Sequence, residues 1–485
     1  MFFLSHDITH VLIYFSKTKL PRQGKFIMSY QSVNPFNNQK LKDYPSHSDQ
    51  DIQNALDTAE KILKSEWSQQ VDTRIDVLRK LASNMRERKS ELAKLMALDM
   101  GKLIKQGEGE IESCARIAEY YANHTKEFLA PVSYETELGE AWVEHHPLGI
   151  IMAVEPWNFP FYQLMRVFAP NCAIGNPVLA KHASIVPQCA EAFEQLIIDA
   201  GAPRGVWTNL FINSDQVADI IADPRVQGVA LTGSEGAGRA VAGQAGKHVT
   251  KSTLELGGND VFIVLDDADL EKAIKIGCQA RINNAGQVCT AAKRFILHEN
   301  IAEEFKAGMV KVFKDLKVGD PLDPETQLGP LSSADALEKL TEQVENAVKN
   351  GATLVTGGKP VDHDGNFYEP TILENISRDN PAWYEEFFGP VAQLYVAKSE
   401  DEIVAIANDS HYGLGGVIHS QNIERAKKLA SRVETGMIWI NWYTDTAPEL
   451  PFGGIKNSGY GHELSIDGFK EFAQKKLVVV KSPKK

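Results

Sequence analysis

The spacing of apolar positions changes along the chain. In the first part apolar residues recur every three or four positions, which predicts helices over residues 48–65, 71–88, 90–99 and 104–128. Ser48 and Asp51 have the spacing of a capping box, so the first helix should begin there. We expect this helical block to pack outside a sheet.

Short apolar runs alternate with helical patterns from residue 149 onward. Strands are predicted over 149–154, 177–181, 209–212 and 228–232, and helices over 161–172, 187–200, 216–222 and 236–245. A second block has a strand over 261–265, a helix over 269–285 and a strand over 295–297, and the alternation continues to 438–441. Strands separated by helices indicate βαβ units and parallel sheets, which bind ligands at the carboxyl ends of their strands. The apolar run 477–480 would be an exposed edge, which pairing with another subunit would cover.

Composition narrows the class of protein. The chain has 485 residues, with 43% hydrophobic and 24% charged residues, as in an ordinary globular protein of two or three domains. A net charge of −13 argues against nucleic-acid binding as the main function. The five cysteines have no metal or disulfide spacing, which favours a cytoplasmic protein.

Nothing in the sequence predicts membrane insertion or export. No apolar stretch reaches the roughly 18 residues needed to span a bilayer. Basic residues follow the apolar N-terminal run instead of preceding it, which is the wrong order for a signal peptide. We interpret residues 1–27 as a poorly ordered extension and Met28 as the natural start.

Polar residues and glycines follow the predicted strands of the first block. Asn158, Lys181, Ser184, Gly233 and Ser234 lie at these strand ends. The turn at Gly233 and Ser234 does not match GxGxxG, but it places backbone N–H groups at a helix N-terminus, where a diphosphate could bind. Lys181 is either a solvated charge or a ligand of ribose or phosphate.

Three groups suit attack on an aldehyde. Cys289 closes the run Asn-Ala-Gly-Gln-Val-Cys, a poor core segment, and is a candidate nucleophile rather than a packing cysteine. Glu255 ends an apolar strand before two glycines and is a candidate base, although an exposed strand glutamate is the alternative. Asn158, held between Trp157 and Phe159, could donate to an oxyanion, although a turn asparagine is the alternative. Arg166, on the following helix, faces either solvent or a substrate carboxylate.

Together these motifs resemble the aldehyde dehydrogenase superfamily from about Met28 to the end of the chain. The resemblance implies that Cys289 is the nucleophile, that Glu255 is the general base, and that Asn158 forms the oxyanion hole with the Cys289 N–H. It implies a cofactor site made by Trp157, Lys181, Ser184, Gly233, Ser234, Glu386 and Phe388, in which Glu386 binds the nicotinamide ribose and Phe388 packs near the nicotinamide.

The resemblance also implies an α/β fold with two Rossmann-type parallel-sheet domains and a small β oligomerisation element. The cofactor-binding domain is expected over 28–130 and 150–257, the catalytic domain over 258–445, and the oligomerisation element over 131–149 and 465–485. A homodimer or homotetramer is expected.

The residues after Lys181 bear on the choice of cofactor. Relatives that prefer NAD often carry a glutamate where this chain has Ser184, and that charge opposes a 2′-phosphate. Ser184 removes the charge, and a protonated His182 could add a cation. We therefore expect NADP to be accepted and preferred, with NAD or dual use as the alternative.

Within the superfamily the chain is most similar to bacterial succinate-semialdehyde dehydrogenases of the lactic-acid-bacterium type. Arg166 matches an arginine that holds the substrate carboxylate in such enzymes. There are two departures: Asn283 stands where some relatives have a second arginine, and Ala291 where some have a second cysteine. The expected substrate is succinate semialdehyde. The alternatives are another small aliphatic or aromatic aldehyde, CoA-acylating chemistry, a cofactor-independent thiol hydrolase, and a non-catalytic cofactor-binding protein.

Overall fold

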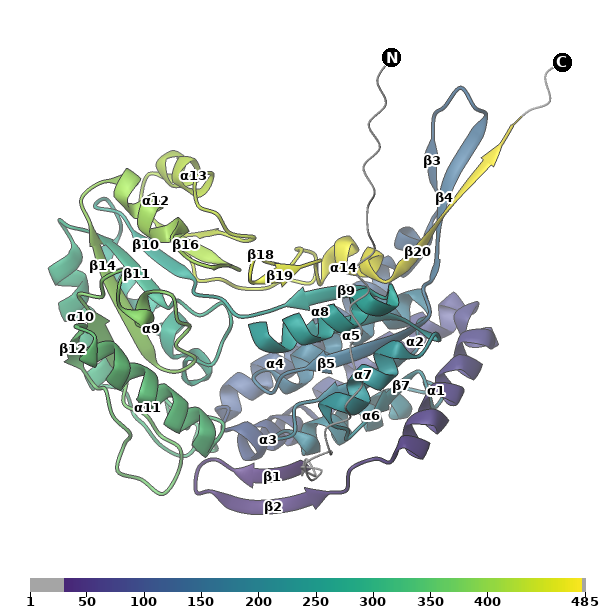
Figure 1. Cartoon of the computed structure of the whole chain (residues 1–485), viewed down its shortest axis with the longest axis horizontal. Helices are drawn as coiled ribbons and strands as arrows, with labels where there is room; N and C mark the ends of the chain where they lie inside the picture. The colour runs from purple at the N-terminus through teal and green to yellow at the C-terminus, as the bar shows by residue number, and fades with distance from the viewer. Residues whose placement is uncertain (1–29, 482–485) are drawn as a thin grey trace, which may run out of the picture.

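A computed structural model describes residues 30–481, whose main elements surround two parallel sheets (Figure 1). The first sheet has six strands, of which five are parallel and β19 is antiparallel to its neighbour. Its order is β19 (Gly459–Tyr460), β9 (Lys251–Glu255), β8 (Val226–Thr232), β5 (Ile150–Glu155), β6 (Val178–His182) and β7 (Trp207–Asn209).

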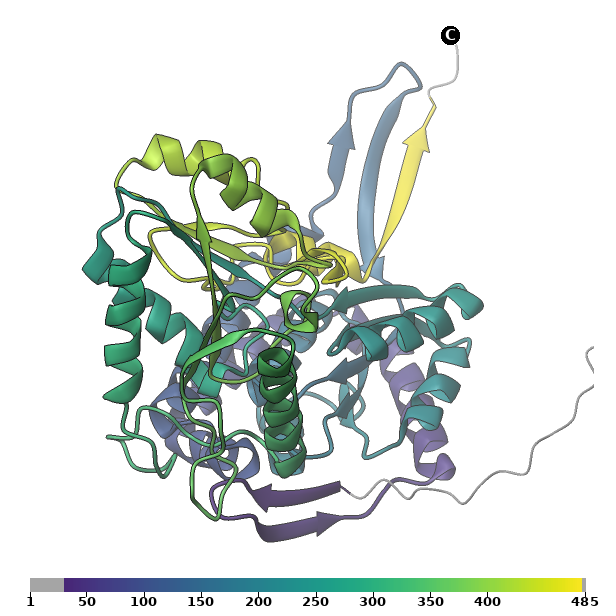
Figure 2. The same ribbon diagram turned by 60° about the vertical axis from the view of Figure 1, so that its left-hand side comes forward.

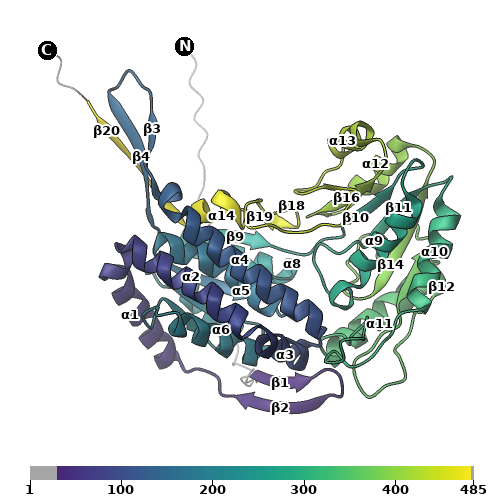
Figure 3. The same ribbon diagram turned by 180° about the vertical axis from the view of Figure 1, so that it is seen from behind.

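Helices cover both faces of this sheet because alternate residues of its strands face opposite sides. Ile151 and Ala153 pack against one set of helices, and Ile150 and Met152 against the other. The first set, in front in Figure 3, is α2 (Val71–Glu87), α3 (Lys89–Met100), α4 (Ile104–Leu129), α5 (Pro160–Ile174) and α6 (Pro187–Asp199). The second set is α1 (Asp49–Lys64), α7 (Ser214–Ala222) and α8 (Glu235–His248).

The second sheet has seven strands and is parallel except at β12. Its order is β12 (Thr353–Thr356), β13 (Thr371–Glu374), β14 (Val391–Ala397), β11 (Arg294–His298), β10 (Val261–Val264), β16 (Gly416–His419) and β17 (Trp439–Ile440). Helices α9 (Leu270–Ile282) and α10 (Ala302–Lys314) cover one face. Helices α11 (Ala334–Lys349), α12 (Glu400–Asn408) and α13 (Ile423–Ala430) cover the other.

A three-stranded antiparallel arm projects from the body (Figures 1 and 2). It consists of β3 (Val132–Tyr134), β4 (Glu140–Pro147) and β20 (Ala473–Val480). The apolar run expected over 477–480 is therefore part of a longer strand, and one of its edges pairs with β4 of the same chain. Within the described residues the other edge of β20 has no partner strand.

The remaining elements are short. They are the hairpin β1 (Tyr30–Asn34) and β2 (Gln39–Tyr44), the pair β15 (Tyr412–Gly413) and β18 (Ile455–Lys456), helix α14 (Ser465–Glu471), and the 3-10 turns η1 (Glu66–Ser68), η2 (Asn283–Gly286) and η3 (Pro381–Trp383). In residues 30–481 no helix combines the length and the apolar character needed to cross a bilayer.

Most predicted elements are confirmed with small shifts at their ends, and the capping box of Ser48 and Asp51 is present. Two predictions are wrong in detail. The strand expected over 209–212 lies at Trp207–Asn209, where it pairs with β6. The helix expected to reach residue 285 ends at Ile282, because Asn284 and Ala285 adopt left-handed conformations with φ of 51° and 53°. The expectations for residues 1–27 and Met28 lie outside the described residues.

Candidate functional site

The carboxyl ends of the first sheet present the polar residues predicted from the sequence. Asn158 follows β5, Lys181 lies in β6 and Ser184 follows it, and Glu255 is the last residue of β9. Between β8 and α8, Ser234 caps the helix, since its hydroxyl accepts a hydrogen bond from the Ala237 N–H. The parallel arrangement of these strands thus gathers the residues at one edge.

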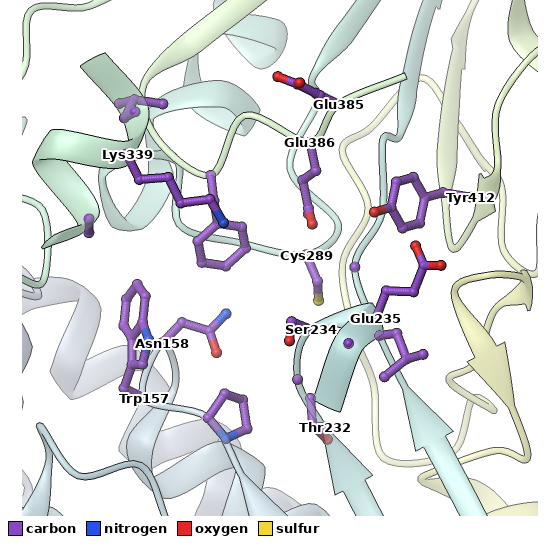
Figure 4. Close-up of a pocket in the computed structure, with 18 of the residues that line it drawn as sticks. Trp157, Asn158, Thr232, Ser234, Glu235, Cys289, Lys339, Glu385, Glu386 and Tyr412 are labelled. Atoms are coloured by element: carbon purple, nitrogen blue, oxygen red, sulfur yellow. The ribbon is translucent and has the colours of Figure 1, made fainter. Parts of the chain in front are cut away.

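A cavity of about 670 Å³ opens beside this edge, and helix α11 and loops near the second sheet contribute its other wall. Figure 4 shows side chains pointing into it from the first sheet, such as Asn158, and from the region of the second sheet, such as Glu386. The predicted residues that line it are Trp157, Asn158, Gly233, Ser234, Cys289, Glu386 and Phe388. Lys181, Ser184, Glu255 and Arg166 do not form part of its wall.

Cys289 is the partly exposed thiol of the molecule, whereas the other four cysteines are buried. The left-handed turn at Asn284 and Ala285 ends α9 and directs the following segment toward the first sheet. Asn284 Nδ2 donates to the carbonyl of Asn158 at 2.8 Å, which ties this segment to the loop after β5. The backbone N–H of Ser332 donates to Gln287 Oε1 at 2.9 Å, which holds the same segment from the other side.

Asn158 faces the segment that carries the thiol. Its side chain is 3% exposed, and its Nδ2 donates to the carbonyl of Gln287 at 3.1 Å. A side-chain amide has two N–H donors, so a second one is available for an oxygen in the cavity. In Figure 4 the Asn158 amide and the Cys289 sulfur are directed toward the same space.

Burial raises the pKa of the Cys289 thiol to about 12, and the nearby cations Arg166 and Lys293 oppose that rise. Positive charge close to the sulfur favours the thiolate that a nucleophile needs.

Glu255 is buried, and neither of its carboxylate oxygens has a hydrogen-bond partner among the described residues. Burial raises its pKa well above the usual value, and the neighbouring Glu463 adds to the rise. A carboxyl with a raised pKa can exchange a proton near neutral pH. The interpretation of Glu255 as an exposed strand residue is excluded.

Arg166 is 2% exposed, so the interpretation that it faces solvent is wrong. Its Nε lies 2.6 Å from Glu463 Oε2, and its Nη2 donates to Gln163 Oε1 at 2.5 Å. The guanidinium also lies over the ring of Phe452, at 4.6 Å from the centroid. Arg166 is therefore the cation of a buried charged cluster.

Glu155 is a second buried carboxyl at the same edge. It follows Val154, which pairs with Leu231, and the next residue of β8, Thr232, pairs with Glu255. Glu155, Thr232 and Glu255 therefore lie at the same level on three neighbouring strands, with side chains on one face. Burial raises the pKa of Glu155 well above its usual value.

The nicotinamide side of the predicted cofactor site is assembled around Glu386. Its Oε1 accepts a hydrogen bond from the Gly258 N–H at 3.2 Å. Trp157 and Phe388 meet edge to face, with ring centroids 5.8 Å apart. A Cβ at Gly257 would lie 2.4 Å from Glu386 Oε2, so any other residue here would displace this carboxylate from its position.

The residues also fit the phosphate part of a dinucleotide. Gly233, Ser234 and Gly236 line the cavity at the N-terminus of α8, and a Cβ at Gly236 would meet no atom within 4 Å. The N-terminus of α8 therefore borders the cavity, where it could bind an anion.

The expectation that His182 adds a cation is wrong. His182 is 1% exposed, its Nδ1 lies 3.2 Å from the carbonyl of Glu155, and burial lowers its pKa to about 4. It is neutral at physiological pH. The nearby Lys181 donates to the carbonyl of His182 at 3.2 Å, and burial lowers its pKa to about 8.

Four residues of the site were not predicted from the sequence. Gln163, Glu155 and Glu463 join the Arg166 cluster, and Lys293 pairs with Glu386, only through the fold. Gln163 and Glu155 lie close to Asn158 in the sequence, and this proximity could have indicated that they belong to the site. Glu463 and Lys293 have no periodic or motif signal of their own.

Comparisons with known proteins find similar chains over nearly the whole length of this one. The model of the aldehyde dehydrogenase family matches residues 23–478. A protein of Deinococcus radiodurans named succinate-semialdehyde dehydrogenase [NADP(+)] is 46% identical over 450 residues, which cover 93% of this chain and 94% of that one. An Escherichia coli succinate semialdehyde dehydrogenase [NAD(P)+] is 41% identical, over 91% of this chain and 96% of that one.

A solved structure shows the same likeness in three dimensions. The succinic semialdehyde dehydrogenase of Streptococcus pyogenes, in complex with NADP+ as the cofactor, superposes with a TM-score of 0.92 at 48% identity. The match covers 93% of this chain and 100% of that one.

Proposed function

The chain belongs to the aldehyde dehydrogenase family, as its motifs predict, and we propose that Cys289, Asn158 and Glu255 carry out its NAD(P)-dependent aldehyde oxidation. The observation that carries this proposal is the placement of Cys289. Its thiol opens onto the cavity between the two sheets, opposite the buried amide of Asn158. The other four cysteines are buried away from it.

Cys289 begins the reaction as a thiolate that adds to the aldehyde carbon. The carbonyl electron pair moves to oxygen, and that oxyanion accepts hydrogen bonds from Asn158 Nδ2 and the Cys289 N–H. The nicotinamide, when bound, supplies the acceptor for the hydride that leaves the same carbon. The product on Cys289 is a thioester.

Glu255 removes a proton from water, which attacks the thioester and releases the acid and the Cys289 thiolate. The raised pKa of Glu255 suits a base that works near neutral pH.

The cofactor would be held along the cavity. Glu386 would accept hydrogen bonds from ribose hydroxyls, with Phe388 and Trp157 beside the nicotinamide. The N-terminus of α8 at Gly233 and Ser234 would bind the diphosphate.

NADP is the preferred cofactor in this proposal. Lys181 would bind the adenosine ribose, and Ser184 leaves room for a 2′-phosphate and brings no opposing charge. The named relatives from Deinococcus radiodurans and Streptococcus pyogenes use NADP, which supports the preference.

The substrate in this proposal is succinate semialdehyde, and Arg166 recognises its carboxylate. Arg166 exerts its charge on Cys289, so it lies near the reacting carbon. A second hollow of about 290 Å³ is lined by Phe452, over whose ring Arg166 lies, and by the loop residues Asp445, Thr446 and Ala447. The names of the relatives support this choice of aldehyde.

The three largest sheets correspond to three proposed units. The six-stranded sheet would serve the cofactor (28–130 and 150–257) and the seven-stranded sheet the catalytic cysteine (258–445). The arm (131–149 and 465–485) would make an oligomer. Leu477, Val479 and Val480 are exposed on β20, and an open apolar strand edge favours pairing with a second copy of the chain.

Replacing Cys289 and Glu255 separates the two halves of the reaction. We expect Cys289→Ala to abolish turnover while NADP binding, followed by protein fluorescence, persists. Glu255→Gln should release one equivalent of reduced cofactor in a burst and then turn over slowly, because only deacylation needs the base. Turnover by Cys289→Ala, or an absent burst in Glu255→Gln, would contradict these roles.

Arg166→Met should raise the KM for succinate semialdehyde about tenfold or more, since a hydrogen bond to a charged group contributes about 1.5–3 kcal/mol. Butanal, which has the same chain length without the carboxylate, is the matched control and should change much less. Equal effects on both aldehydes would remove Arg166 from substrate recognition. Faster oxidation of butanal by the unmodified enzyme would replace succinate semialdehyde with an uncharged aldehyde.

Ser184→Glu should reverse the cofactor preference. A carboxylate here repels the 2′-phosphate, so the KM for NADP should rise about tenfold or more while that for NAD changes little. Ser184→Gln, which has the same size without the charge, is the control and should keep the preference for NADP. A loss of NADP use in both variants would indicate a steric effect instead.

Sedimentation velocity should report a dimer or tetramer. Val479→Lys on β20 should shift the population toward monomer, because a charge on a strand edge opposes pairing. Val396→Lys, at a similarly exposed position on β14, is the control and should leave the oligomer intact. A monomeric unmodified protein would exclude the proposed role of the arm.

A further inference from the structure

A buried lysine lies directly behind the candidate nucleophile. Lys293 precedes β11, and its side chain is 1% exposed. Its Nζ donates to the carbonyl of Cys289 at 2.6 Å and to that of Val288 at 2.9 Å. The third contact is an ion pair with Glu386 Oε1 at 3.0 Å.

These three acceptors match the three N–H donors of an ammonium group. A fully paired, buried charge holds its partners in one geometry, because losing any contact leaves a charged donor unsatisfied. Glu386 is also fixed by the Gly258 N–H at 3.2 Å, so the lysine joins the peptides at 288 and 289 to a second anchored group. The nucleophile segment and the ribose-binding carboxylate are thereby one connected unit.

The charges around Cys289 have opposing effects on its thiol. Arg166, from α5, and Lys293 lower its pKa, whereas Asp260, just before β10, and Glu386 raise it. Burial raises it further and is the largest cause. Lys293 and Glu386 therefore act on the thiol with opposite signs, although they contact each other.

We propose that Lys293 is a positioning residue, which fixes the Cys289 peptide and supplies positive charge to the thiolate, with Glu386 as its counter-charge. The proposal rests on Cys289 being the nucleophile of the proposed function. It implies that the cofactor site and the nucleophile are linked through one ion pair. A hydrogen bond from a ribose hydroxyl to Glu386 would weaken the ion pair between Glu386 and Lys293. The charge of Lys293 would then stabilise the Cys289 thiolate more strongly.

The test is the rate of alkylation of Cys289 by iodoacetamide in the cofactor-free enzyme at pH 8, quantified on the peptide by mass spectrometry. Below the thiol pKa this rate follows the thiolate fraction. A neighbouring charge shifts a pKa by about one unit or more. A thiolate with a lower pKa is also a weaker nucleophile, which cancels about half of this effect on the logarithm of the rate. We therefore expect the alkylation rate to change by about threefold or more.

Lys293→Met should slow alkylation by about threefold or more, and Lys293→Arg should restore the rate to within about twofold. Glu386→Gln should accelerate it, because glutamine still accepts from Lys293 but carries no charge. The double variant Lys293→Met/Glu386→Gln should lie between the two single variants. Opposite changes of the alkylation rate in Lys293→Met and Glu386→Gln are the result that the proposal predicts.

A merely structural role would loosen the segment and move both single variants in the same direction, which would overturn the proposal. Unchanged rates in both would also overturn it. If Lys293→Met does not fold, the alkylation rates of Glu386→Gln and Lys293→Arg test the proposal instead, since both variants keep donors and acceptors in place. The alkylation rate is measured without turnover, so it is independent of the catalytic test. Activity of Cys289→Ala would reject the proposed function, whereas the effect of Lys293 on the Cys289 thiol would still be measured.

Discussion

The active cavity depends on one short crossing between the two sheets. Glu255 ends β9 of the first sheet, and Val261 begins β10 of the second. Between them a Cβ at Gly257 would lie 2.4 Å from Glu386 Oε2, and one at Gly258 would lie 2.7 Å from the carbonyl of Cys289. The backbone therefore passes close to both Glu386 and Cys289, and a side chain at either glycine would crowd them. This close approach brings groups from both sheets to one place, and a longer crossing would separate them.

The same crowding sets the electrostatics of the site. Glu155, Glu255 and Glu463 share the surroundings of one guanidinium, that of Arg166. Burial raises the pKa of all three carboxyls, and one cation cannot stabilise three anions in a medium with little water. The cluster therefore holds protons that an exposed glutamate would have lost. A substrate carboxylate bound at Arg166 would join this competition, so recognition of an anionic aldehyde and the protonation of the base are coupled.

Much of this arrangement could be predicted from the sequence. The alternation of strands and helices indicated parallel sheets, and the rule that such sheets bind ligands at their carboxyl ends placed Asn158, Gly233 and Ser234 correctly. Cys289 was predicted as a nucleophile because its neighbours make a poor core segment, and it lines the cavity. The end of α9 was missed, since Asn284 and Ala285 adopt left-handed conformations that no local propensity of alanine predicts. Tertiary hydrogen bonds to Asn158 hold that turn.

The protonation states could not be predicted, because they depend on burial and on distant partners. His182 follows a strand-end lysine and suggested a cation, yet it is buried beside a backbone carbonyl and stays neutral. Nothing in the sequence around Lys293 marks it as part of the site, yet its Nζ makes three polar contacts in the interior. Motifs indicate candidate reacting groups, because these groups lie in a few short segments of the chain. The charges that tune them come from residues far apart in the chain, where neither spacing nor periodicity carries information.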